Sequence, residues 1–260
     1  MTRGETDSVT DRDPAMPTHT DWLVRWFQRY CRRYAAKHFH AVRLAKSGAA
    51  FPPATGEPLI FVMNHPAWWD VITAFLLSSL MPDYRHYAPI DADMLKKYGL
   101  FRRLGLFGVD QTPRGGAVFL RTANAIFFQP HRALWVTAQG RFADPRDRPL
   151  NLRPGAGAVA SRLTTGWVIP VAVEYPFWDE RTPELLIRVG KPIAINEHTG
   201  DSRVWTALIE DRLAETMDSL AKDAISRDAG RFETMIQGRV GISGLYGWWQ
   251  AFRGRKGHAP

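Results

Sequence analysis

A chain of 260 residues that is 45% hydrophobic is long enough for one α/β domain, and its single cysteine, Cys31, excludes an intramolecular disulfide and a cysteine-rich zinc site. The formal net charge of +8 indicates an anionic partner, and the ten tryptophans favour a membrane surface over nucleic acid, for which no zinc-finger or RNP-type segment is present. The longest apolar run, residues 71–81, has about half of the roughly 20 residues that a membrane span needs, which predicts a soluble or peripheral protein.

The first 50 residues divide into a polar tail and an amphipathic segment. Residues 1–20 are polar, show no periodicity and contain no apolar core of the signal-peptide type, which predicts a disordered tail. In residues 21–50, aromatic and aliphatic side chains recur at helical spacing, while arginines and lysines occupy the other faces. This pattern predicts a basic amphipathic helix that either lies in a membrane interface or packs on its own domain with a solvated basic face.

Strand and helix patterns alternate through residues 51–230, which we predict to be the α/β domain. Strands are predicted at residues 59–63, 86–90, 104–109, 133–137, 167–174 and 184–193. Helices are predicted at residues 66–81, 91–98, 117–128, 157–164 and 201–227. The alternation predicts a mixed, largely parallel sheet flanked by helices. Residues 231–260 combine aromatic residues with cations, which predicts a basic aromatic tail that docks on the domain or forms a second membrane contact.

The segment of residues 64–70, N-H-P-A-W-W-D, places a histidine and a carboxylate at a predicted strand-to-helix junction. Pro66 ends the apolar strand and favours the first turn of a helix. About one turn further on, the Asp70 side chain points back toward the helix N-terminus and toward His65. A carboxylate there can hold one imidazole nitrogen and leave the other free to take a proton, which is the base-and-orienter half of a catalytic triad. A merely structural His–Asp hydrogen bond is the alternative interpretation.

Four segments of the chain together resemble the sequence blocks of the PlsC-like glycerolipid and lysophospholipid acyltransferases. Residues 64–70 match the N-H-x-x-x-x-D block of that family, and residues 168–171, V-I-P-V, match its V-x-P-V block. Residues 108–110, G-V-D, stand where the second block lies, and residues 139–140, Q-G, resemble the third, which is usually F-P-E-G-T-R. The order and spacing of the four blocks make the resemblance specific.

The second and third blocks depart from the family pattern. Gln111 stands where the family commonly has an arginine that binds the acceptor phosphate, and the nearest arginine is Arg114. Gln139 replaces the glutamate of the third block, and Arg141-Phe142 replaces its Thr-Arg. A glutamine can still orient a substrate through hydrogen bonds, but the loss of a bidentate arginine weakens the case for a phosphomonoester acceptor unless Arg114 or Arg141 compensates.

The resemblance implies an O-acyltransferase that moves a fatty acyl group from acyl-CoA or acyl-carrier protein to a hydroxyl of a membrane lipid, such as a lysophosphatidic-acid-like acceptor. His65 is then the general base, and Asp70 fixes its tautomer. Backbone N–H groups near Gln139 and Gly140 are expected to meet the developing oxyanion. The remaining substrate-binding residues that it implies are Asn64, Arg114 and Arg141, with Arg153 as a further candidate cation.

The same resemblance implies that the reaction needs no metal and no bound cofactor, with acyl-CoA or acyl-carrier protein as the co-substrate. We expect the protein to act peripherally on the cytoplasmic side of a membrane. The expected partners are an anionic membrane surface, the lipid acceptor and an acyl-carrier protein, and not nucleic acid.

Several alternatives stay open at this point. The acceptor can be a lipid hydroxyl without a nearby phosphate, such as a glycolipid or a glycosylated terpenoid. An acyl thioesterase would use the same His–Asp pair with water in place of the acceptor. An inactive peripheral membrane scaffold would explain the departures in the second and third blocks, although the intact pair argues against it. A serine hydrolase is poorly supported because no G-x-S-x-G segment is present.

Overall fold

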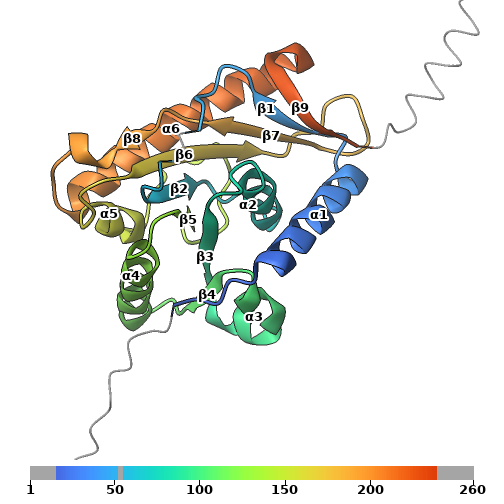
Figure 1. Ribbon diagram of the computed structural model, residues 1–260. Coiled ribbons are helices and arrows are strands. Elements are labelled where there is room, and N and C mark those ends of the chain that lie inside the picture. The colour runs from blue at the N-terminus through green and yellow to red at the C-terminus, as the bar shows by residue number, and fades with distance from the viewer. Residues whose placement is uncertain (1–15, 52–54, 239–260) are drawn as a thin grey trace, which may run out of the picture.

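The structure is a computed structural model that describes residues 16–51 and 55–238 (Figure 1). Within these residues, nine strands form one sheet in the order β4-β3-β5-β2-β6-β7-β1-β9, with β8 beside β6. The predicted α/β class is therefore confirmed. Residues 1–15 of the predicted tail and residues 239–260 of the predicted aromatic tail lie outside the described residues.

The strands of this sheet are β1 (Ala41–Ala45), β2 (Leu59–Met63), β3 (Arg85–Asp91), β4 (Leu106–Val109), β5 (Arg132–Thr137), β6 (Trp167–Glu174), β7 (Glu184–Val189), β8 (Ile193–Ala194) and β9 (Phe232–Gln237). The helices are α1 (Asp21–His38), α2 (Asp70–Ser78), α3 (Ala92–Lys97), α4 (Pro113–Phe127), α5 (Gly155–Ala160) and α6 (Ser202–Ser226). The strands from β4 to β6 are mutually parallel, whereas β7 runs antiparallel to β6 and parallel to β1. The sheet is thus mixed and largely parallel, as predicted.

Strand β2 lies between β5 and β6 and is buried on both faces. Ile60 and Val62 face a cluster formed with α4, α5 and α6. Leu59, Phe61 and Met63 face a second cluster formed with α1 and α2. This double burial explains why β2 reads as a continuous apolar run and not as an alternating pattern.

Several predicted bounds shift by one turn or less. The helix predicted at residues 66–81 begins only at Asp70, because residues 66–69 form an irregular turn. The helix predicted at residues 117–128 begins four residues earlier, at Pro113. The Thr112 hydroxyl caps it by accepting a hydrogen bond from the Gly115 N–H at 3.1 Å.

The prediction that residues 21–50 form one helical unit is wrong, because α1 ends at His38 and β1 follows as an inner strand of the sheet. Arg43 places a charged guanidinium inside the sheet. Its guanidinium is nevertheless satisfied: Nε donates to Glu184 Oε2 at 2.9 Å, and Nη1 donates to Thr234 Oγ1 at 2.9 Å. A buried charge is tolerated when it is paired and hydrogen-bonded in this way.

The described ends of the two predicted tails also belong to the fold. Residues 232–237, predicted as part of the aromatic tail, form β9 and pair antiparallel with β1. Near the other terminus, the Thr20 N–H donates to the Arg103 carbonyl at 2.9 Å and the Gly105 N–H donates to the Thr18 carbonyl at 3.0 Å. The ordered domain therefore extends beyond the predicted bounds of 51–230 on both sides.

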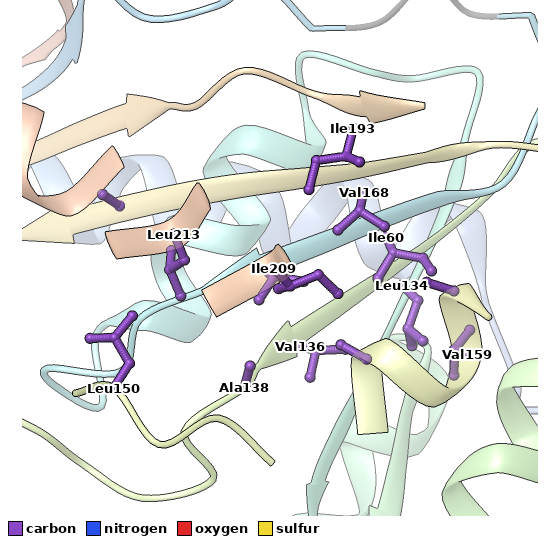
Figure 2. Packing of buried hydrophobic residues seen from close by; sticks show 14 of the residues in the cluster. Ile60, Leu134, Val136, Ala138, Leu150, Val159, Val168, Ile193, Ile209 and Leu213 are labelled. Atoms are coloured by element: carbon purple, nitrogen blue, oxygen red, sulfur yellow. The ribbon is translucent and has the colours of Figure 1, made fainter. Parts of the chain in front are cut away.

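Figure 2 shows how α6 closes the core. Ile209 and Leu213 from α6 lie among side chains of β2, β5, β6 and α5, and both are fully or almost fully buried. Ile225, near the end of the same helix, is 79% exposed. Helix α6 therefore contains one buried and one exposed isoleucine, both in helical backbone, which can be compared directly.

The Ile209→Ala variant is expected to lower the free energy of unfolding by about 2–5 kcal/mol, because it removes buried methyl groups and leaves a cavity. Ile225→Ala is expected to change that free energy by less than about 0.5 kcal/mol. Urea unfolding followed by circular dichroism measures both values. Equal losses in the two variants would contradict this account of the core.

Candidate active site

The candidate site lies where three neighbouring parallel strands end. Residues 64–70 follow β2, residues 138–143 follow β5, and Tyr175 follows β6 directly. Because the carboxyl ends of parallel strands meet at one edge of a sheet, these three segments converge there. This edge is the usual place for a site in an open α/β fold.

His65 and Asp70 form a short hydrogen bond at this edge. The distance from His65 Nδ1 to Asp70 Oδ2 is 2.6 Å. The Asp70 side chain is 1% exposed, whereas the His65 side chain is 22% exposed. Among the described residues, His65 Nε2 has no hydrogen-bond partner. With Nδ1 donating to the carboxylate, Nε2 carries the lone pair of a neutral imidazole, which is the arrangement a general base requires.

Asp70 receives two further hydrogen bonds. The Tyr175 hydroxyl donates to Asp70 Oδ1 at 2.5 Å, and the Ala67 N–H donates to Oδ2 at 3.3 Å. Burial raises the pKa of Asp70 above its ordinary value, although the hydrogen bonds from His65 and Tyr175 act in the opposite direction. Sequence analysis did not identify Tyr175; its only signal was its position immediately after a strand that ends at the site.

The Asn64 side chain, which is predicted to bind substrate, is directed at the backbone of β6 in the structure. Its side chain is buried and both ends of the amide are used: Nδ2 donates to the Val173 carbonyl at 3.0 Å, and Oδ1 accepts from the Val173 N–H at 2.8 Å. Just beyond the end of β2, the Asn64 amide therefore makes to β6 the kind of paired hydrogen bonds that a strand backbone would make. Its function here is to fix the turn that carries His65.

Gln139 and Gly140 also differ from the expectation. Gln139 is buried, and its Oε1 accepts the His65 N–H at 3.0 Å, so this side chain positions the histidine backbone. The Gly140 N–H donates to the Thr137 carbonyl at 3.0 Å and is not free to serve as an oxyanion donor. The Ala143 N–H donates to the His65 carbonyl at 3.0 Å, so the loop after β5 binds both backbone groups of His65.

The predicted arginines do not all reach the site. Arg114 is exposed in the first turn of α4, and Arg141 is exposed and donates to the Phe142 carbonyl at 3.5 Å. No recorded contact among the described residues joins either guanidinium to His65 or Asp70. Arg153 is better placed: it donates to Gln111 and lies so close to Gly140 that a Cβ there would collide with its guanidinium.

Exposed aromatic side chains occur beside the histidine, one in contact with its ring and one three residues further along the chain. The Phe142 ring lies 4.4 Å from the His65 ring, centroid to centroid, and is 59% exposed. Trp68, three residues after His65, is 56% exposed. An exposed apolar ring thus lies against the imidazole, which suits a substrate with an apolar chain.

In the part of the chain that the structure describes, no three histidine, cysteine, aspartate or glutamate side chains gather closely enough to hold a metal ion. The chemistry that the described residues themselves provide is acid–base chemistry at His65. The expectation of a metal-free reaction stays a prediction.

Comparison with known proteins supports the fold. A 1-acyl-sn-glycerophosphate (LPA) acyltransferase, PlsC, from Thermotoga maritima is similar in structure, with a TM-score of 0.57 and 11% sequence identity over 77% of this chain and 80% of that one. Neither the protein-family models nor the curated proteins give a match to the sequence. At this identity, the similarity shows that the two chains share a PlsC-like fold.

The structural role of Asn64 is open to a direct test. Asn64→Asp removes the donor to the Val173 carbonyl and places a buried carboxylate oxygen against it. The free energy of unfolding at neutral pH is expected to fall by about 1–3 kcal/mol, the usual cost of leaving a buried polar group unsatisfied. Asn124→Asp, at an exposed position of α4, is the matched control and is expected to be nearly neutral. Wild-type stability of the Asn64 variant in urea unfolding would refute the role.

Proposed function

We propose that the protein is an O-acyltransferase that moves a fatty acyl group from a thioester to a hydroxyl of a membrane lipid. The observation that carries this proposal is the His65–Asp70 pair: a buried carboxylate holds Nδ1 while Nε2 stays available on a partly exposed ring. The likeness in fold to an LPA acyltransferase supports it. No nucleophilic side chain is needed, because the acceptor hydroxyl itself attacks.

The proposed reaction is a direct transfer. His65 Nε2 takes the proton of the acceptor hydroxyl as its oxygen attacks the thioester carbonyl, and the Asp70 carboxylate stabilises the imidazolium that forms. The tetrahedral intermediate then collapses, the carbon–sulfur bond breaks, and Nε2 returns the proton to the departing thiolate. Products are the lipid ester and a free thiol, and the histidine ends in its starting state.

The acyl donor that we propose is acyl-CoA or acyl-carrier protein. Both carry negative charge, and the formal net charge of +8 on this chain favours the approach of either one. Arg153 supports an anionic substrate in particular, since it is positioned over the loop that binds His65.

For the acceptor, we propose a lysophosphatidic-acid-like lipid whose phosphate binds Arg153. Arg153 then supplies the bidentate charge that Gln111 lacks, and the hydrogen bond between these two side chains orients the guanidinium. A glycolipid or a glycosylated terpenoid is the second candidate acceptor. The observation that favours it is the neutral side chain of Gln111 itself, where the resembling family has an arginine.

The His65→Ala variant is expected to lower acyl transfer by about 10²–10⁴-fold, the usual contribution of general-base catalysis, without loss of folding. The assay incubates purified protein with a labelled acyl thioester and total lipid from its source, and identifies labelled products by mass spectrometry. His198→Ala is the control, because the His198 ring binds the Ala194 carbonyl away from the site. Wild-type activity in the His65 variant would refute the mechanism.

The products of the same assay separate the candidate functions. Label in phosphatidic acid supports the phosphate acceptor and the role of Arg153. Label in a glycolipid or a terpenoid ester supports the second acceptor. Free fatty acid alone identifies a thioesterase, and membrane binding without turnover of any donor identifies an inactive scaffold.

We further propose that α1 holds the protein on an anionic membrane surface. The inner face of α1 packs on the domain through Leu23, Val24, Cys31 and Ala35. Its outer face carries the exposed rings of Trp22 (59%), Trp26 (50%) and Tyr30 (46%). Exposed arginines lie beside these rings, as in helices that bind the interface of an anionic bilayer. None of the helices in the described ranges is long and apolar enough to span a bilayer.

These rings belong to a longer aromatic row, which we define as Trp22, Trp26, Tyr30, Tyr34 and Trp68. The Trp26 and Tyr30 rings stack at 6.2 Å, Tyr30 and Tyr34 lie 6.1 Å apart, and Tyr34 meets Trp68 edge-on at 6.0 Å. The row thus joins the outer face of α1 to the turn that carries His65. A lipid that enters from this surface arrives beside the candidate base.

The double variant Trp22→Ser/Trp26→Ser is expected to weaken binding to vesicles of anionic phospholipid at least about tenfold, since burial of each ring contributes on the order of 1.5–3 kcal/mol. Cosedimentation measures the binding, and high salt is expected to weaken it further. Phe128→Ser is the control, because that ring is 91% exposed but follows α4. An equal effect of the control, or none in the double variant, would contradict docking through α1.

A further inference from the structure

The end of β6 and the residue that follows it contact both ends of the segment of residues 64–70. At one end, the backbone of Val173 binds the Asn64 amide. At the other end, the Tyr175 hydroxyl donates to Asp70 Oδ1 at 2.5 Å. One short stretch from a distant part of the sequence therefore fixes the residue before the histidine and the carboxylate after it.

The position of Tyr175 is determined by its surroundings. Its ring packs edge-on against Trp69 at 5.3 Å and lies 5.9 Å from Phe39, and Phe39 in turn packs against Trp69 at 4.9 Å. The Thr73 hydroxyl lies 3.3 Å from the Tyr175 hydroxyl. The phenol is thus packed on its apolar sides and directed at Asp70 by its one polar atom.

We propose that Tyr175 is a positioning residue of the acyl-transfer reaction, whose hydroxyl keeps Asp70 ionised and oriented so that Asp70 can hold His65 in the reactive tautomer. This inference rests on the proposed function for its catalytic consequence. Tyr175 itself touches neither reacting atom and acts only through Asp70.

The groups around Asp70 explain why the hydrogen bond from Tyr175 affects the ionisation of the carboxylate. The groups that face the carboxylate are the His65 imidazole, the Ala67 N–H and the Tyr175 hydroxyl. His65 and Ala67 both donate to Oδ2. Among the described residues, Tyr175 is the donor to Oδ1. Burial and the neighbouring Asp70 charge raise the pKa of Tyr175 well above its ordinary value, so the phenol stays protonated and remains a donor.

Removal of the Tyr175 hydroxyl is expected to raise the pH at which the His65–Asp70 pair takes up a proton. The hydroxyl stabilises the form of the pair in which Asp70 is ionised and His65 is neutral, which is the form that can accept a proton from substrate. Without the hydroxyl, that anionic form is less stable and the pair takes up a proton at higher pH. The acid limb of the pH–rate profile is then expected to move upward.

The test uses the full chain with Tyr175→Phe, which removes only the hydroxyl. A ¹⁵N NMR titration of the His65 ring is expected to give a midpoint about one pH unit higher than in the wild type, and kcat/KM on the acid limb is expected to fall about tenfold. Tyr84→Phe is the matched control, because that hydroxyl accepts the Gly56 N–H outside the site. A midpoint and an acid limb that both stay at the wild-type positions would overturn the proposal.

A second replacement is expected to shift the titration midpoint in the opposite direction. It also keeps the tyrosine ring in place, so a folding defect cannot explain the result. Site-specific 3-fluorotyrosine at position 175 keeps the ring and strengthens the phenol as a donor, so the midpoint is expected to fall below that of the wild type. An unchanged or raised midpoint would count against the proposal. The titration needs no substrate. A chain that transfers no acyl group but shows both shifts would therefore refute the proposed function and leave the Tyr175–Asp70 coupling supported.

Discussion

The buried carboxylate of Asp70 is the constraint on which the site depends. An ion removed from water costs several kcal/mol unless neighbouring groups replace its hydration. Here His65, Ala67 and Tyr175 do so, with hydrogen bonds of 2.6, 3.3 and 2.5 Å. These donors come from two parts of the chain that lie more than a hundred residues apart. The carboxylate can therefore be buried and ionised only when the sheet has assembled and β6 stands beside β2.

The register of the three central strands brings these donors together. Met63, the last residue of β2, is aligned with Thr137 of β5 on one side and with Val171 of β6 on the other. Two residues beyond those partners stand Gln139 and Val173, which bind the His65 N–H and the Asn64 amide. Each neighbouring strand thus supplies one hydrogen-bonding residue, two positions after the residue that is aligned with Met63. A shift of β5 by one residue would turn the Gln139 side chain to the opposite face of the sheet, and a shift of β6 would move the Val173 backbone groups away from the Asn64 amide.

The sequence predicted the strands β2 and β6 to the residue, because both are apolar runs that end in recognisable polar or turn residues. It also predicted the His65–Asp70 pair, since both members lie within one local segment. It did not reveal the functions of Asn64, Gln139 and Tyr175. Their hydrogen bonds depend on strand register across the sheet, and a single sequence carries no local signal of that register.

Strands β1 and β9, which sequence analysis missed, have a different explanation. Strand β1 contains a buried arginine, and β9 mixes polar and apolar residues, so neither resembles a core strand by composition. Arg43 is acceptable inside the sheet only because Glu184 and Thr234 arrive from β7 and β9 to bind it. Such compensation is visible only in three dimensions, because the partners lie 141 and 191 residues away in the chain.

Helix α1 connects the proposed membrane face to the His65–Asp70 pair through Phe39, the residue that directly follows it. Phe39 is 1% exposed and packs against Tyr175, whose hydroxyl binds Asp70, and against Trp69, the residue before Asp70. On its outer side, the same helix meets Trp68 through Tyr34. The helix is therefore part of the wall of the site and cannot be an independent anchor. Any displacement of α1 by a bilayer would be transmitted to the rings that pack beside Asp70, because close-packed side chains leave little room to absorb a shift.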